Sequence, residues 1–227
     1  MKYIFVFIFT VLSVYGIAQK SEIRDVQSFD KIDVFGNLEV IMEQGEKEEL
    51  RIESKLVEPS EVSVDVKDKL LKIKISENLF EDKIVARVYI KYKEIREISS
   101  NASAEIILKN TVKGDKLFLT ATSGGRITLN VDLNAIDIDI YQGANIDITG
   151  KTKIQETYVN TGGILSGSKF ISKEAFVKMN TGGQAEIEVT ERIEASINTG
   201  ANLSYFGKPK QKDIKTSLGG KITAWDE

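Results

Sequence analysis

A pair of small residues recurs at a nearly constant interval through the second half of the chain, and this repeat constrains the fold more than any other feature. The first members of the pairs are 19, 19, 20, 18 and 19 residues apart, at Gly124, Gly143, Gly162, Gly182, Gly200 and Gly219. A degenerate earlier copy is expected at Ser100 to Ile107, SNASAEII. A fixed period of this length is typical of solenoids, in which each repeat is one turn of a coil.

The residues around each glycine alternate between apolar and polar. Positions −5, −3, +3 and +5, counted from the first glycine of each pair, are apolar at 21 of 24 places. The interleaved positions −4, −2, +2 and +4 are apolar at three of 24, whereas 41% of 24 places is about ten. Alternation on both sides of a glycine predicts two β-strands per repeat, each with one buried face. The glycine supplies the positive φ that a tight corner requires.

An all-β fold follows, in which rungs of about 19 residues stack into a parallel β-solenoid over residues 99–227. The alternative is an antiparallel meander, which would favour hairpin signals such as Asn-Gly at both ends of each repeat. The second junctions differ in length and composition, which favours a solenoid with loops along one edge. These junctions are Asp132–Ala135, Gly150–Lys153, Lys169–Glu174, Glu191–Arg192 and Lys208–Asp213.

Residues 19–98 alternate in the same way but lack the glycine period. This N-terminal region is predicted to form either irregular rungs or an antiparallel cap. A cap is expected on physical grounds, because the open end of a solenoid is an unpaired sheet edge. No long helix is predicted in this region, and Lys91 to Ile98 is the segment that best fits a short one.

Residues 1–18 have the pattern of a signal peptide. Lys2 precedes the apolar run Tyr3 to Ile17, whose fifteen residues are short for a membrane span. Gly16 and Ala18 place small residues where a signal peptidase reads the chain. Cleavage after Ala18 is expected, which predicts an exported protein with no transmembrane anchor after cleavage.

The composition excludes most catalytic chemistry. The chain contains no cysteine and no histidine, so disulfides, thiol nucleophiles, Ser-His-Asp triads and ordinary zinc or haem sites are excluded. A formal net charge of −3 argues against nucleic acid as a partner. No cofactor is expected, and only carboxylate, lysine or hydroxyl chemistry remains.

The strongest acidic candidates are Asp137, Asp139 and Asp147. Asp137 and Asp139 alternate with isoleucines, so both are expected to point outward, ~7 Å apart along one strand. That spacing suits a catalytic carboxylate pair or, together with Asp147, a weak Ca²⁺ site. The alternative is a solvated strand face with no site.

A second polar feature is a column of asparagines at equivalent places in successive repeats. Asn160, Asn180 and Asn198 are expected to stack with Thr122 and Ser217. Such a column could bind glycans, or its side chains could hydrogen-bond to the corners and to one another.

Several segments together resemble a known family. They are FDKIDVFGNLEVIMEQG (residues 29–45), VYIKYKEIREISSNASAEI (residues 88–106), the serial glycine corners, YFGKP (residues 205–209) and SLGGKITAWD near the end. This arrangement is similar to the putative auto-transporter adhesin head GIN domain family, DUF2807, over nearly the whole mature chain. The resemblance implies a right-handed β-helix, export by envelope-bearing bacteria, especially Bacteroidetes, and adhesion. It brings no catalytic residues.

The expected function is therefore that of an exported, non-enzymatic β-solenoid, an adhesin or a binding or structural protein of the bacterial cell envelope. Its expected partners are glycans or components of the envelope or of a host surface. The alternative is a polysaccharide-cleaving β-helix enzyme that uses Asp137 or Asp139.

Overall fold

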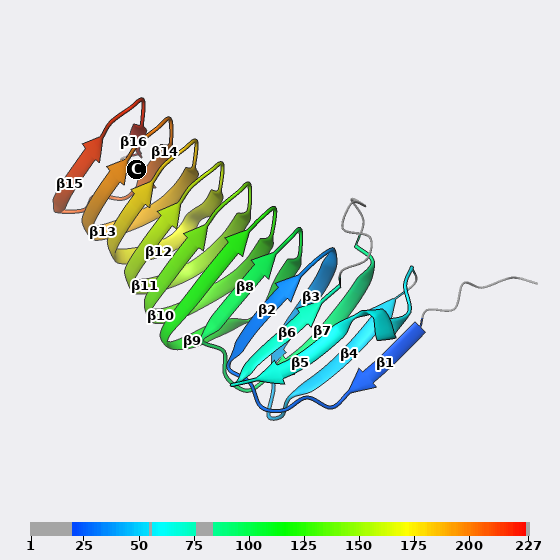
Figure 1. Cartoon of the computed structure of the whole chain (residues 1–227). Helices are drawn as coiled ribbons and strands as arrows, with labels where there is room; N and C mark the ends of the chain where they lie inside the picture. The colour runs from blue at the N-terminus through cyan, green and yellow to red at the C-terminus, as the bar shows by residue number, and fades with distance from the viewer. Residues whose placement is uncertain (1–19, 55, 76–83, 226–227) are drawn as a thin grey trace, which may run out of the picture.

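The computed structural model describes residues 20–54, 56–75 and 84–225, which wind into one elongated coil of β-strands (Figure 1). The strands within these ranges belong to a single 16-stranded sheet system. The one helical element among these residues is the short η1, Pro59–Glu61. The helix expected at Lys91 to Ile98 is wrong, because Lys91 and Tyr92 end one strand and Glu97 begins the next. Within the described ranges, no helix has the length and apolar character needed to cross a membrane.

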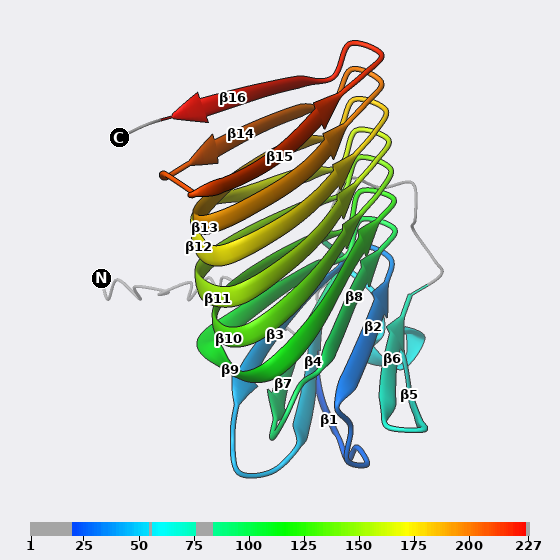
Figure 2. The same cartoon turned by 90° about the vertical axis from the view of Figure 1, so that its left-hand side faces the viewer.

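The glycine repeats form a parallel solenoid, as predicted, and the antiparallel meander is wrong. Each rung pairs in parallel with the next at an offset of one repeat, so that Ile127 lies beside Ile146 and Ile138 beside Thr157. Figure 2 shows the rungs stacked with their corners along one edge. The rungs are β9 Glu105–Thr122, β10 Arg126–Ile140, β11 Asn145–Val159, β12 Ile164–Met179 and β13 Gln184–Ile197, followed by β14 Asn202–Phe206, β15 Gln211–Thr216 and β16 Lys221–Trp225.

The edge opposite the corners differs from the prediction of two strands joined by loops. From β9 to β13, each strand runs unbroken around this edge, and only the segment between Phe206 and Gln211 interrupts a later rung. A continuous strand keeps its backbone hydrogen bonds to both neighbouring rungs, which a loop would lose. Differences in repeat length appear as irregularities in register, such as the one between Gly167 and Ile171.

Each corner is a tight turn with two successive positive φ angles. In the corner of β11, Thr161 has φ 49° and Gly162 has φ 72°. The N–H of Gly163 closes the turn on the carbonyl oxygen of Asn160 at 3.1 Å. This is the geometry of a type I′ turn. The degenerate copy is confirmed as a corner without glycine, because Ala102 and Ser103 have φ 52° and 64°.

The two members of each glycine pair are required for different reasons. A Cβ on Gly162 would meet nothing within 4 Å, so the first position requires glycine for its φ alone. A Cβ on Gly163 would lie 2.8 Å from Ile140 Cγ2 and 2.9 Å from the Ile140 carbonyl oxygen. The second position therefore requires a small residue because the preceding rung approaches closely.

The N-terminal region contains both predicted arrangements, irregular rungs and a cap. Strands β2 Lys31–Phe35 and β3 Leu38–Gln44 form one rung, and β6 Leu70–Lys74 and β7 Ala86–Tyr92 lie in the next one outward. The first of these rungs pairs in parallel with β8 Glu97–Asn101 and with β9. The rung that comes first in the sequence therefore lies between two rungs that come later in the sequence.

The outer end of these rungs is covered by antiparallel strands. Strand β4 Glu49–Ser54 pairs with β7, and β1 Lys20–Arg24 pairs with β4. On the other side, β5 Ser63–Lys67 pairs with β6. One apolar core runs through the rungs into this cap, from Leu203 to Phe29. The predicted signal peptide, residues 1–18, lies outside the described residues.

Candidate functional site

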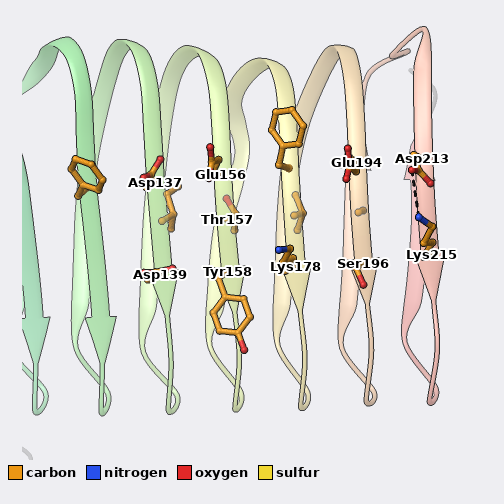
Figure 3. Close-up of a pocket in the computed structure, with 15 residues that line it drawn as sticks. Asp137, Asp139, Glu156, Thr157, Tyr158, Lys178, Glu194, Ser196, Asp213 and Lys215 are labelled. Carbon is orange, nitrogen blue, oxygen red and sulfur yellow. Dashed lines mark ion pairs between the residues drawn. The ribbon is translucent and has the colours of Figure 1, made fainter.

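A groove of about 870 Å³ follows the outer face of the sheet made by the second halves of the rungs (Figure 3). Two parallel rows of outward-facing side chains line it. The upper row in Figure 3 contains Asp137, Glu156, Glu194 and Asp213. Phe118 and Phe176 belong to the same row, because Phe118 pairs with Asp137 and Phe176 pairs with Glu156. The lower row consists of Asp139, Tyr158, Lys178, Ser196 and Lys215. The groove therefore extends across several rungs of the solenoid.

The rows are a consequence of the parallel register. Asp137 pairs with Glu156, and Asp139 with Tyr158, so equivalent residues of successive rungs lie side by side. Neighbouring strands of a sheet are ~4.8 Å apart, which sets the spacing along each row. Because side chains alternate across a strand, both rows face outward while the residues between them, such as Ile138, are buried. The predicted outward direction of Asp137 and Asp139 is confirmed.

Most carboxylates of the upper row have a basic partner. Lys116 Nζ lies 2.8 Å from Asp137 Oδ2 and also 4.6 Å from the centre of the Phe118 ring. Arg192 pairs with Glu194 at 3.0 Å and lies 5.3 Å from the centre of the Phe176 ring. The aromatic rings of this row are therefore already in contact with cations.

Asp139 differs from these carboxylates. It is partly buried, and within the described part of the chain its carboxylate forms no ion pair and no hydrogen bond. Burial and then the charge of Asp137 raise the pKa of Asp139. The neighbouring aromatic rings of Tyr141 and Tyr158 are tilted at 55°, with centres 5.5 Å apart. Burial, followed by the charge of Asp139, raises the pKa of Tyr141.

The asparagine column lies beside the lower row, at the corners. The Tyr158 hydroxyl accepts hydrogen bonds from Asn160 Nδ2 at 3.2 Å and Asn180 Nδ2 at 3.4 Å. Asn198 Nδ2 donates to Asn180 Oδ1 at 3.3 Å, and the Ser217 hydroxyl donates to Asn198 Oδ1. These contacts favour the second interpretation of the column, a hydrogen-bonded ladder that supports the corners and fixes the Tyr158 ring.

Asp147 does not join the other two aspartates. It lines a separate groove of about 350 Å³, on the first halves of the rungs, and Asn145 Nδ2 donates to its Oδ2 at 3.2 Å. The three predicted Ca²⁺ ligands are therefore divided between two grooves. Among the residues that the structure describes, no group of three or more acidic side chains could hold a metal ion.

The sequence reasoning missed the upper row apart from Asp137. The row occupies position −6 from each first glycine, one place beyond the positions compared in the repeats. Extending the comparison would have shown four carboxylates and two phenylalanines in one column.

Asp137 and Asp139 lie on the same strand and on the same face of the sheet. Both carboxyl groups would therefore contact a bound ligand from the same side.

The comparisons with known proteins agree with this architecture. The model of a family described as "Putative auto-transporter adhesin, head GIN domain" matches residues 28–209. A crystal structure titled "putative adhesin", from Bacteroides fragilis, superposes with a TM-score of 0.81 at 16% identity and covers 92% of this chain and 98% of its own. No curated protein matches the chain.

Two structures from Parabacteroides distasonis are also similar. One, titled "putative adhesin", has a TM-score of 0.71. The other, titled "Putative lipid binding protein", has a TM-score of 0.72. Each is 18% identical and covers 92% of this chain and 97% of its own. At these identities the likeness shows the fold.

Proposed function

Because the chain belongs to the DUF2807 family, described as "Putative auto-transporter adhesin, head GIN domain", we propose that it is an exported, non-enzymatic binding protein of the bacterial cell envelope. Its binding site is the groove lined by the rows of Asp137 and Asp139, and its ligands are glycans. The observation that carries this proposal is the interleaving of aromatic rings and carboxylates along one groove, with Phe118 43% exposed. Concave sites that combine apolar contact area with a few polar groups are the usual form of a ligand site.

The physical support comes from the chemistry of sugars. A sugar ring offers hydroxyl groups that donate to carboxylates and C–H groups that pack on aromatic rings. Phe118 and Phe176 supply rings at two places in the upper row, and Glu156 supplies an exposed acceptor between them. Buried backbone groups of the rungs are hydrogen-bonded to neighbouring rungs, so side chains supply the recognition.

The arrangement of the carboxyl groups supports a binding role over cleavage. Glycosidases place two carboxyl groups on either side of the scissile bond. Here Asp137 and Asp139 share one face, and Lys116 neutralises Asp137. One observation favours the enzyme as a second candidate: the raised pKa of Asp139, which is a property of general acids.

The test is glycan-array binding by the mature chain, residues 19–227, beside a turnover assay on neutral and acidic polysaccharides. We expect binding without turnover, and loss of binding in Phe118→Ala. The matched control is Ile171→Ala, which removes a side chain of similar exposure, 41%, outside the groove. Turnover that Asp139→Asn abolishes would establish the enzyme instead. Equal binding by the two alanine variants would exclude this groove.

Export rests on the predicted signal peptide. Mass spectrometry of the protein recovered from the culture medium or envelope should give Gln19 as the first residue. A mature protein that retains Met1 would contradict cleavage after Ala18. The groove's carboxylates also argue against anionic lipid headgroups as the ligand, so vesicles of anionic lipid should not bind.

A further inference from the structure

The two ends of the groove differ in charge. At the end formed by β10 and β11, Asp137, Asp139 and Glu156 provide three carboxylates, and Lys116 compensates one of them. No basic partner of Asp139 or Glu156 is found within the described residues. This end therefore carries two uncompensated negative charges. A groove lined by one sign of charge concentrates ligands of the opposite sign.

The opposite end is balanced. Glu194 pairs with Arg192 at 3.0 Å, and Asp213 pairs with Lys215 at 3.6 Å. Lys178 adds a further positive charge at the centre of the lower row. A cationic group is therefore favoured at the end nearest Asp139 and not along the whole groove.

From this asymmetry we propose that the groove binds an amino-sugar polymer and that a free primary ammonium group of the polymer occupies the end nearest Asp139. The proposal rests on the proposed function and names its ligand class. The ammonium group lies against Asp139 and the Tyr158 ring, with Glu156 on the neighbouring rung. The remaining sugar units extend over Phe176 toward Glu194.

The side chains around Asp139 fit an ammonium group better than a metal ion. A metal would require several oxygen ligands converging on one point, whereas these carboxylates are spread over two rungs and two rows. An ammonium group needs one close carboxylate and is also attracted to the face of an aromatic ring. Lys116 and Arg192 already make such ring contacts in this groove. Partial burial of Asp139 strengthens its attraction for a cation relative to bulk water.

A sugar polymer fits the groove better than a basic peptide. Extended peptides commonly bind by adding a strand to an exposed sheet edge. The groove lies on a sheet face, where β11 hydrogen-bonds to β10 on one side and to β12 on the other and so leaves no free edge. A ligand there contacts side chains that repeat every ~4.8 Å, which suits a polymer of similar rigid units.

The experiment compares two tetrasaccharides with the same linkage, one of glucosamine and one of N-acetylglucosamine, by isothermal titration calorimetry with the mature chain at neutral pH. Acetylation removes the positive charge and keeps the sugar backbone. We expect the acetylated tetramer to bind about tenfold more weakly, the equivalent of ~1.4 kcal/mol. Asp139→Asn and Glu156→Gln should each reduce this difference. Asp147→Asn, which removes the same charge from the other groove, should leave it unchanged.

Each outcome distinguishes the proposals. Equal affinity for the two tetramers would overturn the ammonium site while glycan binding remained established. Binding of neither tetramer, together with a blank glycan array, would overturn both the ligand class and the proposed function. Tighter binding of a lysine tetrapeptide than of the glucosamine tetramer would overturn the sugar assignment. Circular dichroism of Asp139→Asn shows whether the variant is folded, and Glu156→Gln provides an independent test at an exposed position.

Discussion

The N–H of Gly182 donates a hydrogen bond of 3.0 Å to the carbonyl oxygen of Thr199, at the corner of the next rung. The same bond joins Gly162 to Thr181 and Gly143 to Thr161. The residue before each first glycine must therefore present its carbonyl group along the axis, and it does so with a positive φ, 48° at Thr199. The corners thus form a hydrogen-bonded ladder of their own, at the cost of an unfavourable backbone conformation.

The first prediction concerns this conformation. Thr181 has φ 46°, which is unfavourable for a β-branched residue, whereas asparagine tolerates the left-handed region. Thr181→Asn should increase the free energy of unfolding by about 0.5–1 kcal/mol. The measurement is urea denaturation followed by circular dichroism. The control is Thr128→Asn, in the strand β10, where threonine is favoured and the change should not stabilise. A loss of stability at position 181 would contradict the prediction.

The second prediction concerns the second position of the pair. At two corners this position is glycine and faces a β-branched residue of the preceding rung, at Gly163 facing Ile140 and Gly183 facing Val159. At Gly125 it is glycine because a Cβ would meet the backbone carbonyl group of Ser100. It is alanine at Ala144, whose preceding rung has Ala121 at the equivalent place. Gly163→Ala should therefore lower the free energy of unfolding by about 1–3 kcal/mol. The new methyl group would press on Ile140, which cannot move away without disturbing the core.

A double-mutant cycle tests this explanation. In the Ile140→Ala background, which reproduces the natural pair of Ala121 and Ala144, the cost of Gly163→Ala should fall by about 1 kcal/mol. Additive effects of the two substitutions would show that the Ile140 side chain is not the cause. The close carbonyl oxygen of Ile140 would then explain the whole cost.

The regular rungs could be predicted from the sequence because every repeat carries the same local pattern. Leu119, Ile138 and Val177, which define one apolar position, are all buried. The order of the N-terminal rungs could not be predicted, because it depends on long-range pairing. Lys31 of β2 pairs with Leu70 on one side and with Glu97 on the other. No local pattern distinguishes that order from stacking in chain order.

The site was partly predictable for a similar reason. Alternation with isoleucines placed Asp137 and Asp139 on the outer face. The parallel register lays Tyr158 beside Asp139, with Lys178 one rung further along the solenoid. The groove itself was not predicted, because two of its lining residues, Phe118 and Phe176, are apolar in an otherwise acidic column of the repeat. Similarly, threonine, glutamine and leucine at the corners gave no indication of positive φ, because these residue types rarely adopt it.

The third prediction concerns a polar pair inside the core. Gln155 is fully buried between Ile136 and Ala175 of the neighbouring rungs, and its Nε2 donates to the Thr157 hydroxyl at 2.9 Å. Its Oε1 has no hydrogen-bond partner within the described part of the chain. The double variant Gln155→Leu/Thr157→Val should increase the free energy of unfolding by about 1–3 kcal/mol, because it removes the unpaired acceptor.

The single variant provides the control. Thr157→Val leaves the Gln155 amide group without its acceptor and should destabilise by about 1–3 kcal/mol. The two variants therefore shift the midpoint of urea denaturation in opposite directions. A double variant less stable than the natural chain would mean that Gln155 makes a contribution that its hydrogen bonds do not explain.

The fourth prediction concerns the pH dependence of stability at Asp139. Burial and the charge of Asp137, on the same strand, raise the folded-state pKa above the unfolded value. The folded state therefore binds this proton more tightly, and the stability that Asp139 contributes is lost as the pH rises through the folded pKa. Asp139→Asn should raise the melting temperature at pH 7, and the gain should disappear in acid, below the unfolded pKa of ~3.9.

On the neighbouring strands, the residues that face Asp139 carry no charge at neutral pH: Thr120 on β9 and the phenol Tyr158 on β11. Lys178 lies one rung beyond Tyr158. Asp137→Asn removes an equal charge but also breaks the ion pair with Lys116, so it should give no comparable gain. Asp139→Asn should therefore raise the melting temperature at neutral pH and also remove the preference for the glucosamine tetramer. Both results together would show that the Asp139 carboxylate lowers the stability of the fold and increases the affinity for the ligand. A melting temperature below that of the natural chain at pH 7 would mean instead that the folded state stabilises the charged carboxylate.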